Sequence, residues 1–154
     1  MTKPRVFLPN ENRILDLFGA TLHFKATASD TNGGYSVIDG AFDPGGFAPL
    51  PHSHDAEDES FYVLDGEFNF RIGEAESVGR PGDLLVAARG VPHGFAASGD
   101  RRSRLLIIHS PSIEGFFIEM AKLSAAGPPE PATIGPVMQA WGMQLVSHTQ
   151  AGMP

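Results

Sequence analysis

Apolar and polar residues alternate in short runs over most of the first 110 residues, and glycine, proline, asparagine and aspartate separate the runs. Alternation with a period of two is typical of strands that bury one face. It is clearest over residues 21–27 and 35–43, on either side of the turn-rich segment 29–34. Further strands are expected over 77–88, 92–98 and 103–110. Short strands at this spacing predict a β-sandwich or a small β-barrel.

Residues 61–73 are predicted to form two strands around Asp65-Gly66, a dipeptide typical of two-residue hairpin turns. The register of such a hairpin would place four apolar side chains on one face: Phe61, Val63, Phe68 and Phe70. That face is expected to line the interior of the barrel, because a sheet buries its apolar side.

The pattern changes after Pro111, where apolar residues recur at helical rather than strand spacing. A helix is expected over about 112–127, with Ser112 as its cap and Gly127-Pro128-Pro129 at its end. A second short helix is expected over 134–145. These helices should cover the barrel or a partner subunit.

The chain has 154 residues and an ordinary globular composition, with 42% hydrophobic and 19% charged residues. This length suits one domain with its own core. We therefore expect a single domain over residues 1–154, with the barrel at about 20–110 and a helical appendage at about 112–147.

Charge and cysteine content exclude several classes of function. The formal net charge of −7 argues against a nucleic-acid partner, which requires a basic surface. There is no cysteine, so a metal ion could be held only by nitrogen and oxygen ligands. No window is long and apolar enough for a membrane span, and the N-terminus lacks the apolar core of a signal peptide. We therefore expect a cytoplasmic protein with no membrane or nucleic-acid partner.

The stretch PHSHDAEDESFYVLDG, from Pro51 to Gly66, carries the candidate chemistry. His52 and His54 lie two residues apart, so in a strand they face the same side, and imidazole suits Zn, Fe, Ni, Cu and Mn. A His-x-His pair alone is weak evidence, because surface loops contain such pairs by chance. Four acids could complete a metal site or form a solvated loop: Asp55, Glu57, Asp58 and Glu59.

Strand parity favours Glu59 among these acids. It shares the parity of Phe61 and Val63, so its carboxylate should point inward at the end of the strand. Glu57 shares that parity but lies further from the strand. A carboxylate beside phenylalanines is costly unless it is paired or bound to a metal. Glu59 is therefore the favoured carboxylate ligand.

This stretch resembles the first motif of the cupin family, in which a glycine, a His-x-His pair, a glutamate and a second glycine follow at set spacings. Every position is met, by Gly46, His52, His54, Glu59 and Gly66. The second motif of the family resembles residues 82–97, which keep its glycines and its histidine as Gly82, Gly90 and His93. Ala88 and Ala97 stand where that motif has proline and asparagine.

The resemblance implies an all-β fold, a double-stranded β-helix or jelly-roll barrel of the small single-domain cupins, here with short C-terminal helices. It implies one divalent transition metal ion (Fe, Mn, Ni, Cu or Zn) held by His52, His54, Glu59 and His93. It also suggests a homodimer. The chain looks similar to the single-domain cupins described as quercetin-dioxygenase-like, and in that interpretation Glu59 could also act as the catalytic base.

Four phenylalanines are candidates for the wall of a pocket beside the metal, three because the hairpin register turns them inward and Phe95 because it shares the parity of His93: Phe61, Phe68, Phe70 and Phe95. Such a wall suits an apolar or aromatic small molecule. The competing interpretation, which the usual packing of aromatic residues favours, is that they are simply core. His109 could also reach the pocket by its parity, although a surface histidine at the strand end is the favoured interpretation.

Three functions remain open. The first is a metal-dependent, dioxygenase-like enzyme that acts on a small apolar or aromatic organic molecule. The second is a non-redox isomerase or lyase that uses the metal as a Lewis acid. The third is a small-molecule-binding module without turnover. Because one fold hosts many chemistries, the resemblance does not choose among them.

Overall fold

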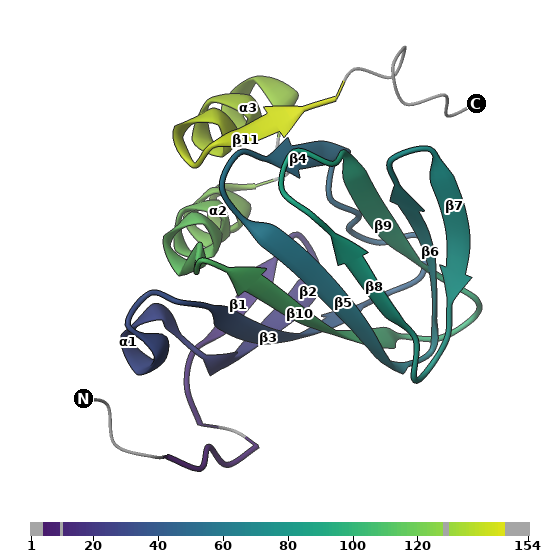
Figure 1. The fold of residues 1–154 in the computed structure, drawn as a ribbon, viewed down its shortest axis with the longest axis horizontal. Coiled ribbons are helices and arrows are strands. Elements are labelled where there is room, and N and C mark those ends of the chain that lie inside the picture. The colour runs from purple at the N-terminus through teal and green to yellow at the C-terminus, as the bar shows by residue number, and fades with distance from the viewer. Residues whose placement is uncertain (1–4, 10, 128–129, 147–154) are drawn as a thin grey trace.

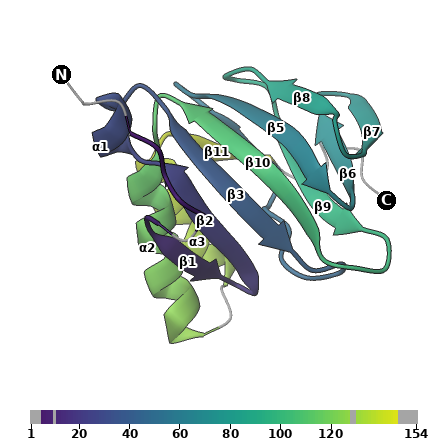
Figure 2. The ribbon, with the colours of Figure 1, turned by 90° about the horizontal axis from the view of Figure 1, so that it is seen from below.

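The structure, a computed structural model, describes residues 5–9, 11–127 and 130–146. It consists of two antiparallel sheets packed face to face as a barrel, with the C-terminal helices beside it (Figure 1, Figure 2). The predicted all-β jelly-roll barrel with short C-terminal helices is confirmed.

The first sheet has the strand order β1-β2-β3-β10-β5-β8. Its strands are β1 Ile14–Leu17, β2 Ala20–Ala26, β3 Ser36–Phe42, β5 Asp58–Asp65, β8 Leu84–Ala87 and β10 Ser103–Ser110. The second sheet has the order β11-β4-β9-β6-β7. Its strands are β4 His52–His54, β6 Glu67–Ile72, β7 Ala75–Gly79, β9 His93–Ser98 and β11 Met143–Leu145. The helices are α1 Ala28–Thr31, α2 Glu114–Ala126 and α3 Pro131–Ala140.

The chain changes sheets at Asp65-Gly66, and the hairpin predicted there is wrong. β5 pairs with β10 and β8 in the first sheet, whereas β6 pairs with β9 and β7 in the second. Gly66 has a φ of 77°, and a Cβ built on it would fall on the side chain of Ser103. The Glu67 N–H donates to Ser103 Oγ at 3.2 Å. This close approach forms a corner, and the chain crosses to the facing sheet instead of returning along β5.

The inward-facing residues of these two strands were nevertheless predicted correctly, because alternation within a strand does not depend on its neighbour. All four apolar side chains are buried between the sheets: Phe61, Val63, Phe68 and Phe70. Phe42 of β3 joins them from the first sheet, with its ring edge-on to that of Phe95 at a centroid distance of 5.1 Å. The core therefore fills the space between the two sheets.

The C-terminal region packs against the barrel and supplies one of its strands. α2 buries Phe116 and Met120, and the Trp141 ring lies over Gly115 of the same helix. α3 ends at Ala140, and residues 143–145, which were expected to be helical, form β11 beside β4. None of the helices in the described ranges is both long and apolar enough to cross a membrane.

Candidate metal centre

Short segments from both sheets bring the candidate ligands together. β4 carries His52 and His54, and it lies between β11 and β9, with His52 paired to His93 of β9. β5 of the facing sheet starts at Asp58, and its second residue, Glu59, points inward at this end of the barrel. All four side chains are buried, because no more than 8% of any of these residues is exposed.

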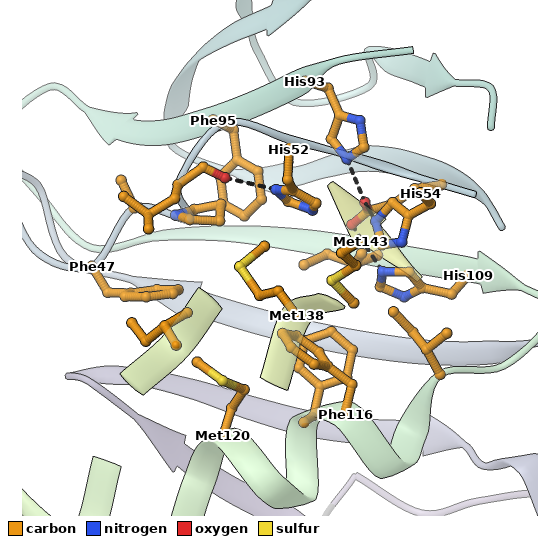
Figure 3. A pocket seen from close by; sticks show the side chains of 18 of the residues that line it. Phe47, His52, His54, His93, Phe95, His109, Phe116, Met120, Met138 and Met143 are labelled. Atoms are coloured by element: carbon orange, nitrogen blue, oxygen red, sulfur yellow. Dashed lines mark hydrogen bonds and ion pairs between the residues drawn. The ribbon is translucent and has the colours of Figure 1, made fainter. Parts of the chain in front are cut away.

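The ligand atoms of these residues converge on one point. His93 Nε2 lies 2.7 Å from Glu59 Oε2, and His54 Nε2 lies 3.1 Å from the same oxygen. One side-chain nitrogen or oxygen from each of the four residues lies within 4.8 Å of all the others. Figure 3 shows His52, His54 and His93 directed toward the same space.

Backbone carbonyls determine how two of the imidazoles face this point. His52 Nδ1–H donates to the Leu50 carbonyl at 2.7 Å, and His93 Nδ1–H donates to the Val91 carbonyl at 2.9 Å. Because a carbonyl only accepts, Nδ1 carries a proton in both rings, and Nε2 is the nitrogen that faces the cluster. Outer hydrogen bonds of this kind are typical of histidines that bind a metal.

The pKa values of the cluster follow from burial and from these contacts. Burial by itself raises the pKa of Glu59, but the charge of His109 and hydrogen bonds from three histidines outweigh it and hold the pKa well below its usual value. Burial, with the nearby charge of His93, lowers the pKa of His52 to about 4. At neutral pH the cluster therefore offers an anionic oxygen and a neutral imidazole side by side.

This donor set fits a divalent transition metal ion. Three imidazole nitrogens and one carboxylate oxygen are ligands that Fe, Mn, Ni, Cu and Zn share. Since His93 Nδ1 carries a proton, an unprotonated His93 Nε2 would direct its lone pair at the lone pairs of Glu59 Oε2. The two atoms attract each other only if a proton or a cation lies between them. A buried carboxylate in that position is costly without such a positive charge.

The family model for the Cupin domain matches residues 40–109, which contain all four of these residues. Residues 40–109 of this chain therefore form a cupin domain. Among solved structures it is similar to KdgF from Halomonas sp., with 24% sequence identity, a TM-score of 0.65, and coverage of 73% of this chain and 98% of that chain.

Two further solved structures illustrate the likeness. An RmlC-like cupin from Shewanella frigidimarina has 22% identity and a TM-score of 0.63, with coverage of 75% of this chain and 99% of that chain. A predicted oxalate decarboxylase from Thermotoga maritima has 19% identity and a TM-score of 0.56, with coverage of 60% and 80%. At such identities these likenesses show the fold alone. No curated protein matches the sequence.

The two departures from the cupin motifs lie away from the cluster. Ala88 is exposed in a turn in which its carbonyl accepts the Val91 N–H at 3.0 Å, and Ala97 faces the core. Gly90, which the motif keeps, has a φ of 77°, and its N–H donates to the His54 carbonyl at 2.7 Å. The loop before His93 is therefore bonded directly to the strand that carries the first motif.

The interpretation of His109 as a surface residue is wrong, because only 1% of it is exposed. Its Nε2 lies 3.0 Å from Glu59 Oε1, the oxygen that faces away from His54 and His93. Its ring packs edge-on against Phe117 at a centroid distance of 5.3 Å, and its Nδ1 has no hydrogen-bond partner among the described residues. His109 thus contacts one carboxylate oxygen and leaves the other for the cluster. Its strand parity was the sequence signal for this position.

The other acids of the first motif separate into two groups. Glu57 is buried, and its Oε2 lies 3.4 Å from His54 Nδ1, on the side of the ring away from Glu59. Asp55 accepts a hydrogen bond from the Gln144 side chain at 3.1 Å. Asp58 pairs with Arg89 at 2.8 Å on the surface. Glu57 therefore lies beside His54 without a hydrogen bond between them, and the two aspartates bond to neighbouring segments.

A cavity of about 220 Å³ extends from the cluster of His52, His54, Glu59 and His93 toward the C-terminal helices (Figure 3). Of the four phenylalanines expected in its wall, Phe95 lines it, whereas three pack in the core and are not among its lining residues: Phe61, Phe68 and Phe70. Much of the wall comes from residues that the sequence did not indicate: Phe47, Phe116, Met120, Met138 and Met143. Apart from Phe47, which lies within the first motif, these residues are in the C-terminal region, so parity within the strands of the motifs could not find them.

Proposed function

We propose that this cupin is a metal-dependent, dioxygenase-like enzyme that acts on a small apolar or aromatic molecule. The observation that carries the proposal is the position of the cavity. One end of it is the buried cluster of histidines and Glu59, and the rest of its wall is apolar. A substrate in the cavity would meet the metal-binding side chains directly.

The ligands would be His52, His54, Glu59 and His93. A redox-active ion held there supplies electron transfer to dioxygen, which no side chain of the site provides. The apolar walls exclude bulk water and so strengthen polar interactions inside the cavity. Glu59 is ionised and can accept a proton from a substrate hydroxyl as a general base. His109 would keep that carboxylate in one orientation.

Metal content is the first test. We expect elemental analysis to find about one ion per chain in the wild-type protein and none in a His52→Ala, His54→Ala double variant. His23→Ala is the matched control, because His23 lies outside the cluster and bonds to the Glu11 carbonyl. Equal metal content in the double variant and the wild type would contradict the ligand assignment.

Oxygen dependence separates the oxygenase from its alternatives. The iron-loaded protein should consume dioxygen with a phenol or naphthol, and the zinc-loaded protein should not. Product formed with zinc and without dioxygen would instead indicate an isomerase or lyase. A rise in melting temperature with ligand, but no product with either metal, would indicate a binding module.

We also propose that two chains pair as a homodimer. Three large side chains with apolar surface are exposed together on the outer face of β5 and β8: Tyr62, Leu84 and Val86. In the described part of the chain β8 is an edge strand, with β5 as its one neighbour. A second copy on this face would cover both the apolar side chains and the strand edge.

A further inference from the structure

The two ends of the cavity differ in their chemistry. All the polar side chains that line it belong to the cluster and its neighbour: His52, His54, Glu59, His93 and His109. Every other lining residue is apolar, so among the described residues no lysine, arginine or side-chain amide reaches the cavity. A bound molecule could therefore be held by polar contacts at one end only.

Arg89, in the loop before β9, and Arg71, on β6, do not line the cavity. Arg89 is exposed and makes a two-pronged contact with Asp58, at 3.2 and 2.8 Å. Arg71 lies 3.9 Å from both Glu74 and Glu76 and is not among the lining residues. A phosphate or a second carboxylate at the end of a ligand away from the cluster would be buried against the apolar wall without a cation, which is strongly unfavourable.

The size of the cavity limits the ligand further. Its volume is about 220 Å³. An apolar cavity of about 150 Å³ is large enough to hold benzene. The space beside the cluster therefore suits one ring or two fused rings, and it is too small for a frame of four fused rings.

The C-terminal helices set that size. Phe116 and Met120 of α2 and Ile134 and Met138 of α3 are buried and line the cavity, and all four lie outside residues 40–109. Figure 3 shows Phe116 and Met120 on the side of the cavity opposite His93. Methionine is flexible and adapts to the shape of what it contacts. The matched cupin segment thus supplies the polar end, and the helices supply much of the apolar wall.

We propose that α2 and α3 are the selectivity element of this site and that Met120 and Met138 determine the size of the ligand. The ligand class is a hydroxylated aromatic of one or two rings without an anionic group at the end away from its hydroxyl. Its hydroxyl faces the cluster and its rings lie against the two methionines. This inference rests on one part of the proposed function, namely that the cavity is the substrate site. It does not require that the bound molecule is converted to a product.

The test is binding to the zinc-loaded protein, measured by calorimetry with phenol, 1-naphthol, 1-hydroxypyrene and 5-hydroxynaphthalene-1-sulfonate, whose sulfonate is a weak zinc ligand on the ring away from the hydroxyl. We expect 1-naphthol to bind most tightly and the sulfonate to bind at least about tenfold more weakly than 1-naphthol. In Met138→Ala and Met120→Ala, the affinity for 1-hydroxypyrene should rise at least about tenfold relative to phenol. Met138→Leu, which conserves volume, and Leu84→Ala, on the outer face, should keep the wild-type order.

Equal affinities for 1-naphthol and 5-hydroxynaphthalene-1-sulfonate, or an unchanged size order in folded Met138→Ala protein, would overturn the inference even if the iron-loaded enzyme consumes dioxygen. Size selectivity that follows Met138 without any dioxygen uptake would refute the oxygenase and support the inference. If Met138→Ala does not fold, Met138→Phe decides the question. It should exclude 1-naphthol and still admit phenol, and equal binding of both would overturn the proposal.

Discussion

At the residue scale, Glu59 is contacted by histidines on both of its oxygens. Oε2 faces His54 and His93 within the cluster, and Oε1 faces His109 of β10. A carboxylate that is held at one oxygen has less freedom to turn, so the other oxygen stays directed at the ligand site. His109 therefore belongs to the working site although it lies outside both sequence motifs.

Replacing His109 with leucine should weaken zinc binding by about 10- to 100-fold, because the group that orients a ligand is lost while all four ligands remain. His109→Gln keeps a hydrogen-bonding group and should recover part of the affinity. His23→Leu is the control and should bind zinc as the wild type does. Competition with a chelator measures the affinity, and an unchanged value in folded His109→Leu protein would count against this role.

Asp58 and Arg89 form an ion pair outside the cluster. The pair links the start of β5, which carries Glu59, to the loop before β9, which carries His93. Hydrogen bonds from the Arg89 side chain and from its backbone N–H lower the pKa of Asp58 from its usual 3.8 to about 2. A carboxyl with a depressed folded pKa stabilises the fold above its unfolded value, and this contribution is lost as pH falls toward 2. We expect Asp58 to titrate near pH 2 by NMR, and higher but still below 3.8 in Arg89→Ala, which keeps the backbone N–H of residue 89. A wild-type midpoint near 3.8 would contradict the pairing.

At the element scale, the strand that carries His52 and His54 depends on the C-terminus. β4 pairs along its whole length with β11 and only at His52 with β9. The backbone continues this pairing beyond the strand, since the Val146 N–H donates to the Pro51 carbonyl at 3.0 Å. The C-terminal region therefore holds the strand of His52 and His54 in place as well as lining the cavity.

Gln144→Pro should weaken zinc binding and lower the free energy of unfolding by about 2 kcal/mol, because proline cannot donate to β4. Gln144 pairs with Ser53, between the two histidines. Gln144→Ala is the control, because it loses only the side-chain bond to Asp55. Equal zinc affinities in the two variants would show that β4 holds its shape without β11.

The corner at Gly66 permits a second matched comparison. Gly66→Ala should destabilise the protein by about 3 kcal/mol, since a Cβ would both strain a positive φ and fall on Ser103. Gly99 has a similar φ of 84°, but a Cβ there meets nothing within 4 Å. Gly99→Ala should therefore cost about 1 kcal/mol. Chemical denaturation measures both, and equal losses would mean that the approach to Ser103 does not matter.

At the scale of the whole molecule, the site lies where three parts of the chain meet. The second sheet supplies the histidines of the cluster, the first sheet supplies Glu59 and His109, and the C-terminal helices close the cavity. The outer face of the first sheet remains apolar at β5 and β8. This exposed face, rather than the helices, is where we expect the second copy to bind.

Gel filtration should give twice the chain mass of 16.4 kDa. A Leu84→Lys, Val86→Lys double variant should elute as a single chain, because two charges cannot be buried unpaired in the interface. Val78→Lys is the control, since Val78 is also exposed but lies on β7 of the other sheet. A wild-type mass equal to one chain would rule out the homodimer.

Local patterns in the sequence were sufficient for much of the site. Period-two alternation placed Glu59, Phe61 and Val63 on the inner face, and the spacing of the motifs selected the four residues that the structure brings together. The same local signal failed at Asp65-Gly66, because a turn dipeptide does not reveal whether the chain returns along its own sheet or crosses to the other.

The amino-acid sequence by itself determined the class of fold, the inward parity of the strands and the residues of the cluster, because each depends on spacing along one segment. Only the tertiary structure decided the pairing of β5 and β6, the burial of His109 and the cavity wall that includes Met120 and Met138. These features depend on contacts between segments distant in sequence, and no periodicity within one segment encodes which distant segment it will meet.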